Sequence, residues 1–81
     1  MDESERARNY LLIIGVLLHA HPRQILRSTI NDICGNQSRT LEMIDSFGAK
    51  IYEDTKKVGN QTVITYGLTS WYYDEMTGKK S

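Results

Sequence analysis

The stretch from Ile25 to Tyr66 constrains the fold more than any other part of the chain. Two short segments carry apolar residues at helical spacing, and a break at Cys34-Gly35-Asn36 separates them. The glycine in this break supplies the backbone freedom that a tight turn between two helices needs. A two-stranded hairpin follows the second segment directly. This order of elements predicts an α+β fold in which two short helices joined by a turn precede a β-ribbon.

The two short helices are predicted from their apolar stripes. The first is expected from Arg23 or Gln24 to Ile33, and the second opens at Gln37 and ends before Gly48. The predicted core residues are Leu26, Ile30 and Ile33 in the first helix and Leu41, Ile44 and Phe47 in the second. At about 100° per residue, Ser38, Arg39, Glu42, Asp45 and Ser46 should then point outward, with Glu42 free to pair with Arg39.

The hairpin is predicted from residue type and from its turn. Ile51 to Val58 and Gln61 to Gly67 are rich in β-branched and aromatic residues, and the turn dipeptide Gly59-Asn60 separates them. Lys56 and Lys57 precede this turn, so two ammonium groups should lie near the tip. Two interpretations are equally favoured: the lysines contact a nucleic-acid backbone or groove, or they protect an exposed strand edge from aggregation.

A longer helix is expected ahead of this stretch, capped at Ser4 and stopped by Pro22. It is apolar on nearly all sides, and a chain of 81 residues can hardly surround one helix. Part of it is therefore expected to form a homodimer contact, although a central core helix is an equal alternative. A short helix capped by Thr69 or Ser70 should follow the hairpin, and its aromatic residues should cover the core or join that contact. The predicted dimer-interface residues are Leu11, Ile14, Leu18, Trp71 and Tyr72.

Charge and composition limit the class of function. Ten basic and ten acidic side chains cancel, which is unusual for a duplex binder, but Arg23, Arg27 and Arg39 make the turn region locally basic. No catalytic residue, metal site, cofactor or small-molecule substrate is expected. His19 and His21 point to different sides of a helix, Cys34 stands alone, and the glycines are scattered.

One domain is expected over residues 1–76, with a flexible tail over residues 77–81. The lone cysteine and the absence of a secretory signal favour an intracellular, cytoplasmic protein. The apolar run from Tyr10 to Leu18 is too short to cross a membrane, because a spanning helix needs about 20 residues.

From about Asn9 to Gly67 the chain resembles the winged helix-turn-helix domains of bacterial and archaeal regulators, such as those of the IclR, DeoR and biotin-repressor type. The resemblance is carried by Leu12-Ile13-x-x-Val16-Leu17, by Ile30-Asn31-Asp32-Ile33-Cys34-Gly35, by Gln37-Ser38-Arg39-Thr40 and by Gly48-Ala49-x-Ile51. It implies three helices followed by a two-stranded wing. It also implies that Gln37, Ser38, Arg39 and Thr40 read bases, and that Lys56 and Lys57 contact the backbone.

The sequence therefore predicts a small, dimeric regulator of transcription, of prokaryotic or viral type, that binds double-stranded DNA. Arg23 and Arg27 would add phosphate contacts. Three alternatives remain open. The first is a protein-interaction module that has the same fold but does not bind DNA. The second is an excisionase-like architectural protein that bends DNA, and the third is an accessory subunit of a larger enzyme.

Overall fold

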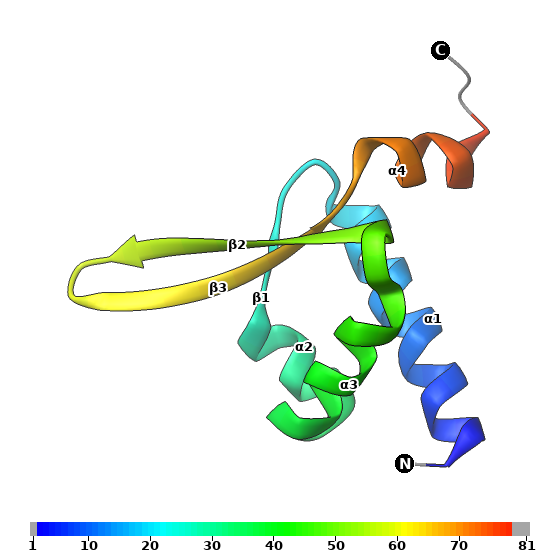
Figure 1. Cartoon of the computed structure of the whole chain (residues 1–81), viewed down its shortest axis with the longest axis horizontal. Helices are drawn as coiled ribbons and strands as arrows, with labels where there is room; N and C mark the ends of the chain where they lie inside the picture. Colours follow the sequence, from blue (N-terminus) through cyan, green and yellow to red (C-terminus); the bar gives the residue numbers. More distant parts are fainter. Residues whose placement is uncertain (1, 79–81) are drawn as a thin grey trace.

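Three antiparallel strands and four α-helices make up the α+β structure of residues 2–78 in the computed structural model (Figure 1). Residues 1 and 79–81 lie outside the described residues. In chain order the elements are α1 (Glu3–Ala20), β1 (Ile25–Leu26), α2 (Arg27–Cys34), α3 (Gln37–Phe47), a 3₁₀ turn (Gly48–Lys50), β2 (Ile51–Val58), β3 (Gln61–Leu68) and α4 (Ser70–Thr77).

The sheet has the strand order β1-β3-β2. The predicted hairpin is confirmed: β2 and β3 pair along their whole length, from Ile51 opposite Leu68 to Val58 opposite Gln61. The predicted start of the second helix at Arg23 or Gln24 is wrong. Ile25 and Leu26 instead form β1, opposite Tyr66 and Thr65, and the helix begins only at Arg27. Pairing with a distant strand thus overrides the local helical pattern.

Helix α1 begins and ends close to the predicted positions. Asp2, not Ser4, is its N-cap, because the Asp2 carboxylate accepts a hydrogen bond from the backbone N–H of Glu5 at 2.8 Å. The helix ends at Ala20, and Pro22 follows. One side of α1 is buried against α2, α3 and the base of the sheet. The buried cluster comprises Ile13, Ile14, Leu17, Ile30, Cys34, Met43, Phe47, Ile51, Tyr66, Leu68 and Tyr72.

The buried stripe of α3 differs from the predicted one. Thr40, Met43 and Phe47 face the core, whereas Leu41 is 43% exposed and Ile44 is partly buried. Thr40 can be buried because its hydroxyl does not lose its hydrogen bonding: it donates to the Asn36 carbonyl at 3.1 Å. Leu26 is also exposed, because it lies in a short edge strand rather than in the predicted helix.

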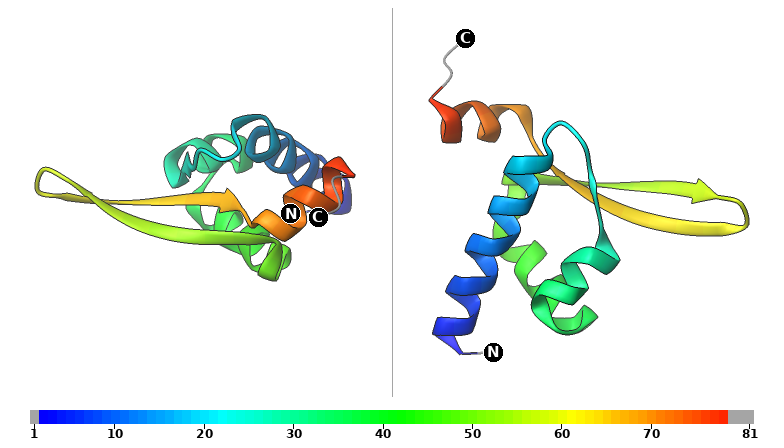
Figure 2. Two further views of the ribbon diagram at one scale, coloured as in Figure 1. Left: turned by 90° about the horizontal axis from the view of Figure 1, so that it is seen from above. Right: turned by 180° about the vertical axis from the view of Figure 1, so that it is seen from behind.

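The distal half of the hairpin projects away from the helices (Figures 1 and 2). From Thr55 to Thr62 every residue is exposed, on both faces of the ribbon. The base of the hairpin, by contrast, buries Ile51, Tyr66 and Leu68 in the core. The hairpin is therefore longer than the packing of the domain requires.

A short helix after the hairpin was predicted, and α4 confirms it. Thr69 is at its N-cap position, but its side chain does not cap the helix, because its hydroxyl donates to the Lys50 carbonyl at 2.9 Å. Thr77, assigned to the flexible tail, is the last residue of this helix. The rest of that predicted tail, beyond Gly78, lies outside the described residues. Among residues 2–78, no helix combines the length and the apolar character needed to cross a membrane.

Candidate nucleic-acid interface

The turn between α2 and α3 presents the first residues of α3 to solvent. Gly35 adopts a left-handed conformation with φ of 102°, which ends α2. Asn36 then caps α3, since its side-chain oxygen accepts a hydrogen bond from the Arg39 N–H at 2.8 Å. Gln37 and Ser38, predicted to read bases, are both exposed at this fixed helix start.

Arg39 lies on the side of α3 that faces the beginning of α1. Its guanidinium is 3.4 Å from the Glu5 carboxylate, and both side chains remain partly exposed. The predicted partner of Arg39, Glu42, pairs with Arg6 instead. The pairing of Glu42 with Arg39 does not form, because the first turns of α1 bring Glu5 and Arg6 next to α3. Exposed pairs of this kind are weak, so Arg39 can exchange Glu5 for another anion at little cost.

Thr40 does not belong to the exposed set. Its side chain is fully buried beneath the turn, so it cannot contact a base as predicted. Burial also raises the pKa of the neighbouring Cys34 thiol, although a hydrogen bond with Thr40 and the charge of Arg39 oppose this effect. Thr40 and Cys34 therefore stabilise the turn from inside.

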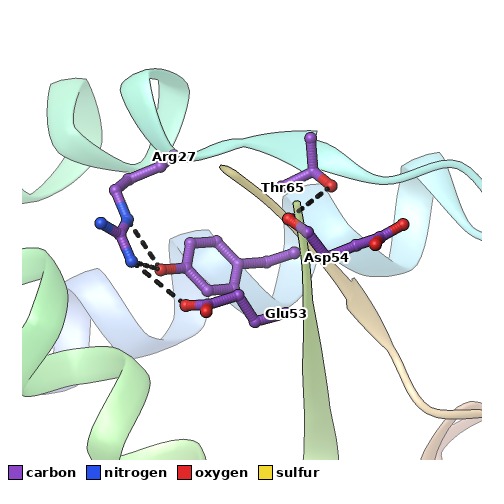
Figure 3. Close-up of polar contacts among 5 residues, drawn as sticks. Arg27, Glu53, Asp54 and Thr65 are labelled. Atoms are coloured by element: carbon purple, nitrogen blue, oxygen red, sulfur yellow. Dashed lines mark hydrogen bonds and ion pairs between the residues drawn. The ribbon is translucent and has the colours of Figure 1, made fainter. Parts of the chain in front are cut away.

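Arg27 ties α2 to the base of the hairpin, as Figure 3 shows. Its Nε and Nη2 atoms donate to the Tyr66 hydroxyl at 2.8 and 2.6 Å, and Nη2 also reaches the Glu53 carboxylate at 3.1 Å. Tyr66 is fully buried, and this burial raises the pKa of its hydroxyl. The Arg27 side chain is only 20% exposed, so in this structure it sets the position of the hairpin. Its predicted contact with phosphate stays a prediction.

Gln24 fixes the opposite face of the hairpin base. Its side-chain oxygen accepts from the Thr65 hydroxyl at 2.7 Å, and its Nε2 donates to the Tyr52 hydroxyl and to Asp54 at 3.2 Å each. The Thr65 hydroxyl also lies near the Asp54 carbonyl (Figure 3). Sequence reasoning missed Gln24 and Tyr66, because their partners become neighbours only when β1 joins the sheet.

The two hairpin lysines lie where they were predicted, beside the tip. Lys56 is opposite Val63 and Lys57 is opposite Thr62, so the two side chains project from opposite faces of the ribbon. Lys57 shares its face with Glu53 and Tyr66, the face that Arg27 of α2 contacts. Both lysines are exposed, and neither forms an ion pair within residues 2–78.

Arg23 lies apart from this set. It is exposed in the connection between α1 and β1, and it lines a groove along α1 rather than the α3 or hairpin surface. The structure thus brings Gln37, Ser38 and Arg39 together at the start of α3, and leaves Arg23 elsewhere.

The predicted dimer-interface residues divide into two groups. Leu11 is 70% exposed and Trp71 is 52% exposed, while Leu18 is partly buried. Ile14 and Tyr72 belong to the buried core, so neither is free to contact a partner, and their assignment was wrong. Tyr72 is buried because α4 folds back over Lys50, whose ammonium group lies 5.4 Å from the Tyr72 ring.

Comparisons with known proteins give no further guide to this surface. No protein-family model matches the sequence, and no curated protein or solved structure matches the chain significantly. Within residues 2–78, no three His, Cys, Asp or Glu side chains are grouped so that they could hold a metal ion.

Proposed function

We propose that the chain is a winged helix-turn-helix protein that binds double-stranded DNA and regulates transcription. The element order α1-β1-α2-α3-β2-β3 and the strand order β1-β3-β2 support this fold. In Figure 1 the hairpin projects to the left while α2 and α3 lie below its base, so the ribbon and the two helices form the arms of an open angle. A duplex in that angle would meet a helix start and a ribbon tip at neighbouring positions.

The observation that carries the proposal is the exposed distal half of the hairpin. Residues Thr55 to Thr62 add little burial, yet they extend the ribbon and carry Lys56 and Lys57 on its two faces. A ribbon of this kind can follow the phosphate backbone or enter the minor groove, where cations are favoured. A role limited to folding would not require this length.

The start of α3 supplies groups suited to base edges. Gln37 offers an amide, Ser38 a hydroxyl and Arg39 a guanidinium, and all three types of side chain hydrogen-bond to bases in the major groove. Of the two acidic residues on the outward face, Glu42 is neutralised by Arg6. Asp45 lies nearer the C-terminal end of α3, which tilts away from the groove in most such complexes.

A protein-interaction module is the second candidate. The net charge is zero, and three of the basic residues already pair with acids: Arg6 with Glu42, Arg27 with Glu53 and Arg39 with Glu5. Leu41 of α3 is 43% exposed, and a protein partner could bury it. This candidate predicts no affinity for DNA at any salt concentration.

The two candidates are separated by fluorescence anisotropy of a labelled mixed-sequence duplex, titrated with protein over a salt series. DNA binding predicts a dissociation constant of about 1–100 μM at physiological salt, with log affinity falling linearly with log salt. Arg8→Ala is the matched control, because it removes one exposed positive charge from α1, outside the residues proposed to contact DNA. No binding at low salt would contradict the proposal.

Arg39 is the leading candidate for base reading. Once a preferred site has been selected from a random library, Arg39→Ala should weaken binding to that site by about 1–3 kcal/mol and relax the sequence preference. An equal loss of affinity on all sequences would make Arg39 a phosphate contact. Strong DNA curvature in a permuted-site gel assay would instead identify an architectural protein.

A further inference from the structure

Helix α1 carries an apolar groove that nothing within residues 2–78 fills. The groove measures about 480 Å³, and Gly15 is one of its lining residues. Apart from its chain neighbours and the backbone of α1 itself, no heavy atom lies within 4 Å of the position that a Cβ on Gly15 would take. Leu11 and Leu12 form its apolar wall, and both are exposed. The lining is completed by Val16, His19, Ala20, Arg23 and Ile25, so the one fully charged group in it is basic.

Helix α4 carries a surface of opposite character. Trp71, Asp74 and Glu75 are spaced three and four residues apart, so they share one face of the helix. Trp71 is 52% exposed, although a side chain of this size is normally buried when a partner is present. Glu75 is exposed, and within residues 2–78 it forms no ion pair within 4 Å. The face therefore joins one large aromatic ring to two carboxylates.

From this complementarity we infer that the chain forms a homodimer in which Trp71 of each copy enters the α1 groove of the other. The ring lies over Gly15 against Leu11 and Leu12, and Glu75 of the partner subunit faces Arg23. An apolar anchor in a pocket with opposite charges at its rim is the usual make-up of a specific interface.

The end of α1 that borders the groove also contacts α4 on the same molecule. His21, next to the groove residue Ala20, stacks on Tyr73 of α4 with ring centroids 3.9 Å apart. The α1 groove and Trp71 thus lie on either side of the contact between His21 and Tyr73. In the inferred dimer, a two-fold axis beside this contact makes each copy give its Trp71 and receive the partner's, so the assembly closes as a dimer and not as an open chain.

Sedimentation equilibrium and intrinsic fluorescence test the inference without DNA, so its outcome is independent of the proposed function. Trp71 is the only tryptophan in the chain, and its emission should shift to shorter wavelength as protein concentration raises the dimer fraction. We expect Arg23→Glu and Glu75→Arg each to raise the dimer dissociation constant about tenfold, since each change acts at two symmetric contacts. The combined variant Arg23→Glu/Glu75→Arg should return close to the wild-type value.

Lys57→Glu is the matched control, because it reverses one exposed charge on the hairpin and should leave the dimer unchanged. Circular dichroism of every variant shows whether a variant that no longer dimerises is still folded. A wild-type chain that stays monomeric at roughly 1 mM would overturn the inference. So would a dimer that survives Trp71→Ala and Glu75→Arg but is lost in Gly15→Leu, since α1 would then pack on a second α1.

Discussion

The two halves of the hairpin lie on the same pair of strands but differ in almost every physical respect. At the base, Ile51, Tyr66 and Leu68 are buried, and Gln24 and Arg27 hold the two faces with side-chain hydrogen bonds. From Thr55 to Thr62, by contrast, every residue of the ribbon is exposed to solvent on both faces. The β2–β3 ladder is nevertheless continuous through both halves.

If the distal half binds DNA as proposed, folding and function are separated along one hairpin. Burial and satisfied polar groups make the base part of the core, whereas the distal half depends on its ladder and its turn and should open more easily. Stability should therefore respond to changes at the base, and DNA affinity should respond to changes at the tip.

The largest effect is expected for Tyr66→Ala at the base. Loss of a fully buried aromatic ring should lower the free energy of unfolding by about 3–5 kcal/mol. The paired change at the tip, Val58→Ala, should alter it by less than about 0.5 kcal/mol, because Val58 is exposed. Urea unfolding followed by circular dichroism measures both. Similar losses for the two variants would remove the distinction between base and tip.

Two arginines that form ion pairs provide a finer comparison. Arg27→Ala should lower the free energy of unfolding by about 1–3 kcal/mol, because it leaves the buried Tyr66 hydroxyl without its donor. Arg39→Ala removes only a half-exposed pair and should cost less than about 1 kcal/mol. Amide hydrogen exchange should show lost protection in β3 for Arg27→Ala alone. An equal loss of stability in both variants would contradict this account of Arg27.

High pH should lower the free energy of unfolding through ionisable groups in and beside the hairpin base, and not through the tip. Burial raises the pKa of Tyr66 and of Tyr72, so above pH of about 10 the unfolded chain releases these protons more readily than the folded chain. Stability should fall as pH rises through this range. Lys50, whose pKa is raised chiefly by its hydrogen bond with Tyr10, acts in the same direction.

The pH effect is measured from urea midpoints at intervals between about pH 8 and pH 11. Tyr66→Phe keeps the ring but cannot ionise, so its stability should fall less steeply with pH than that of the wild type. A profile that stays flat through this range would show that the two hydroxyls titrate alike in the folded and unfolded chains.

The smallest effect on stability is expected for the double variant Lys56→Ala/Lys57→Ala. Both side chains are exposed and, within residues 2–78, neither has an ion-pair partner. Their removal should change the free energy of unfolding by less than about 0.5 kcal/mol. A larger loss, or aggregation of the folded variant, would favour the alternative in which the lysines protect the edge of the ribbon.

Local features of this fold could be predicted from sequence, and non-local ones could not. The hairpin follows from Gly59-Asn60 between two β-rich runs, and the turn after α2 follows from Gly35. Strand β1 was missed because Ile25 pairs with Tyr66, which is distant in the chain. The predicted apolar stripe of α3 did not include Thr40, a polar residue whose burial is possible because its hydroxyl donates to the Asn36 backbone carbonyl.

The candidate site was predictable to a similar extent. Gln37, Ser38, Lys56 and Lys57 are exposed as expected, because exposure at a helix start or a hairpin tip is a local property. The partners of Arg27 and Arg39 depend on how the hairpin and α1 pack against the two short helices. Such ion pairs join residues that are distant in the sequence, so residue spacing alone cannot predict them.

The central claim is that the distal hairpin contacts DNA, and one measurement tests it most directly. The affinity of Lys56→Ala/Lys57→Ala for mixed-sequence duplex DNA should be compared with that of the wild type over a salt series. The account predicts weaker binding and a slope of log affinity against log salt that is shallower by about 2, with Arg8→Ala unchanged. Equal affinity and equal slope for the double variant and the wild type would contradict it.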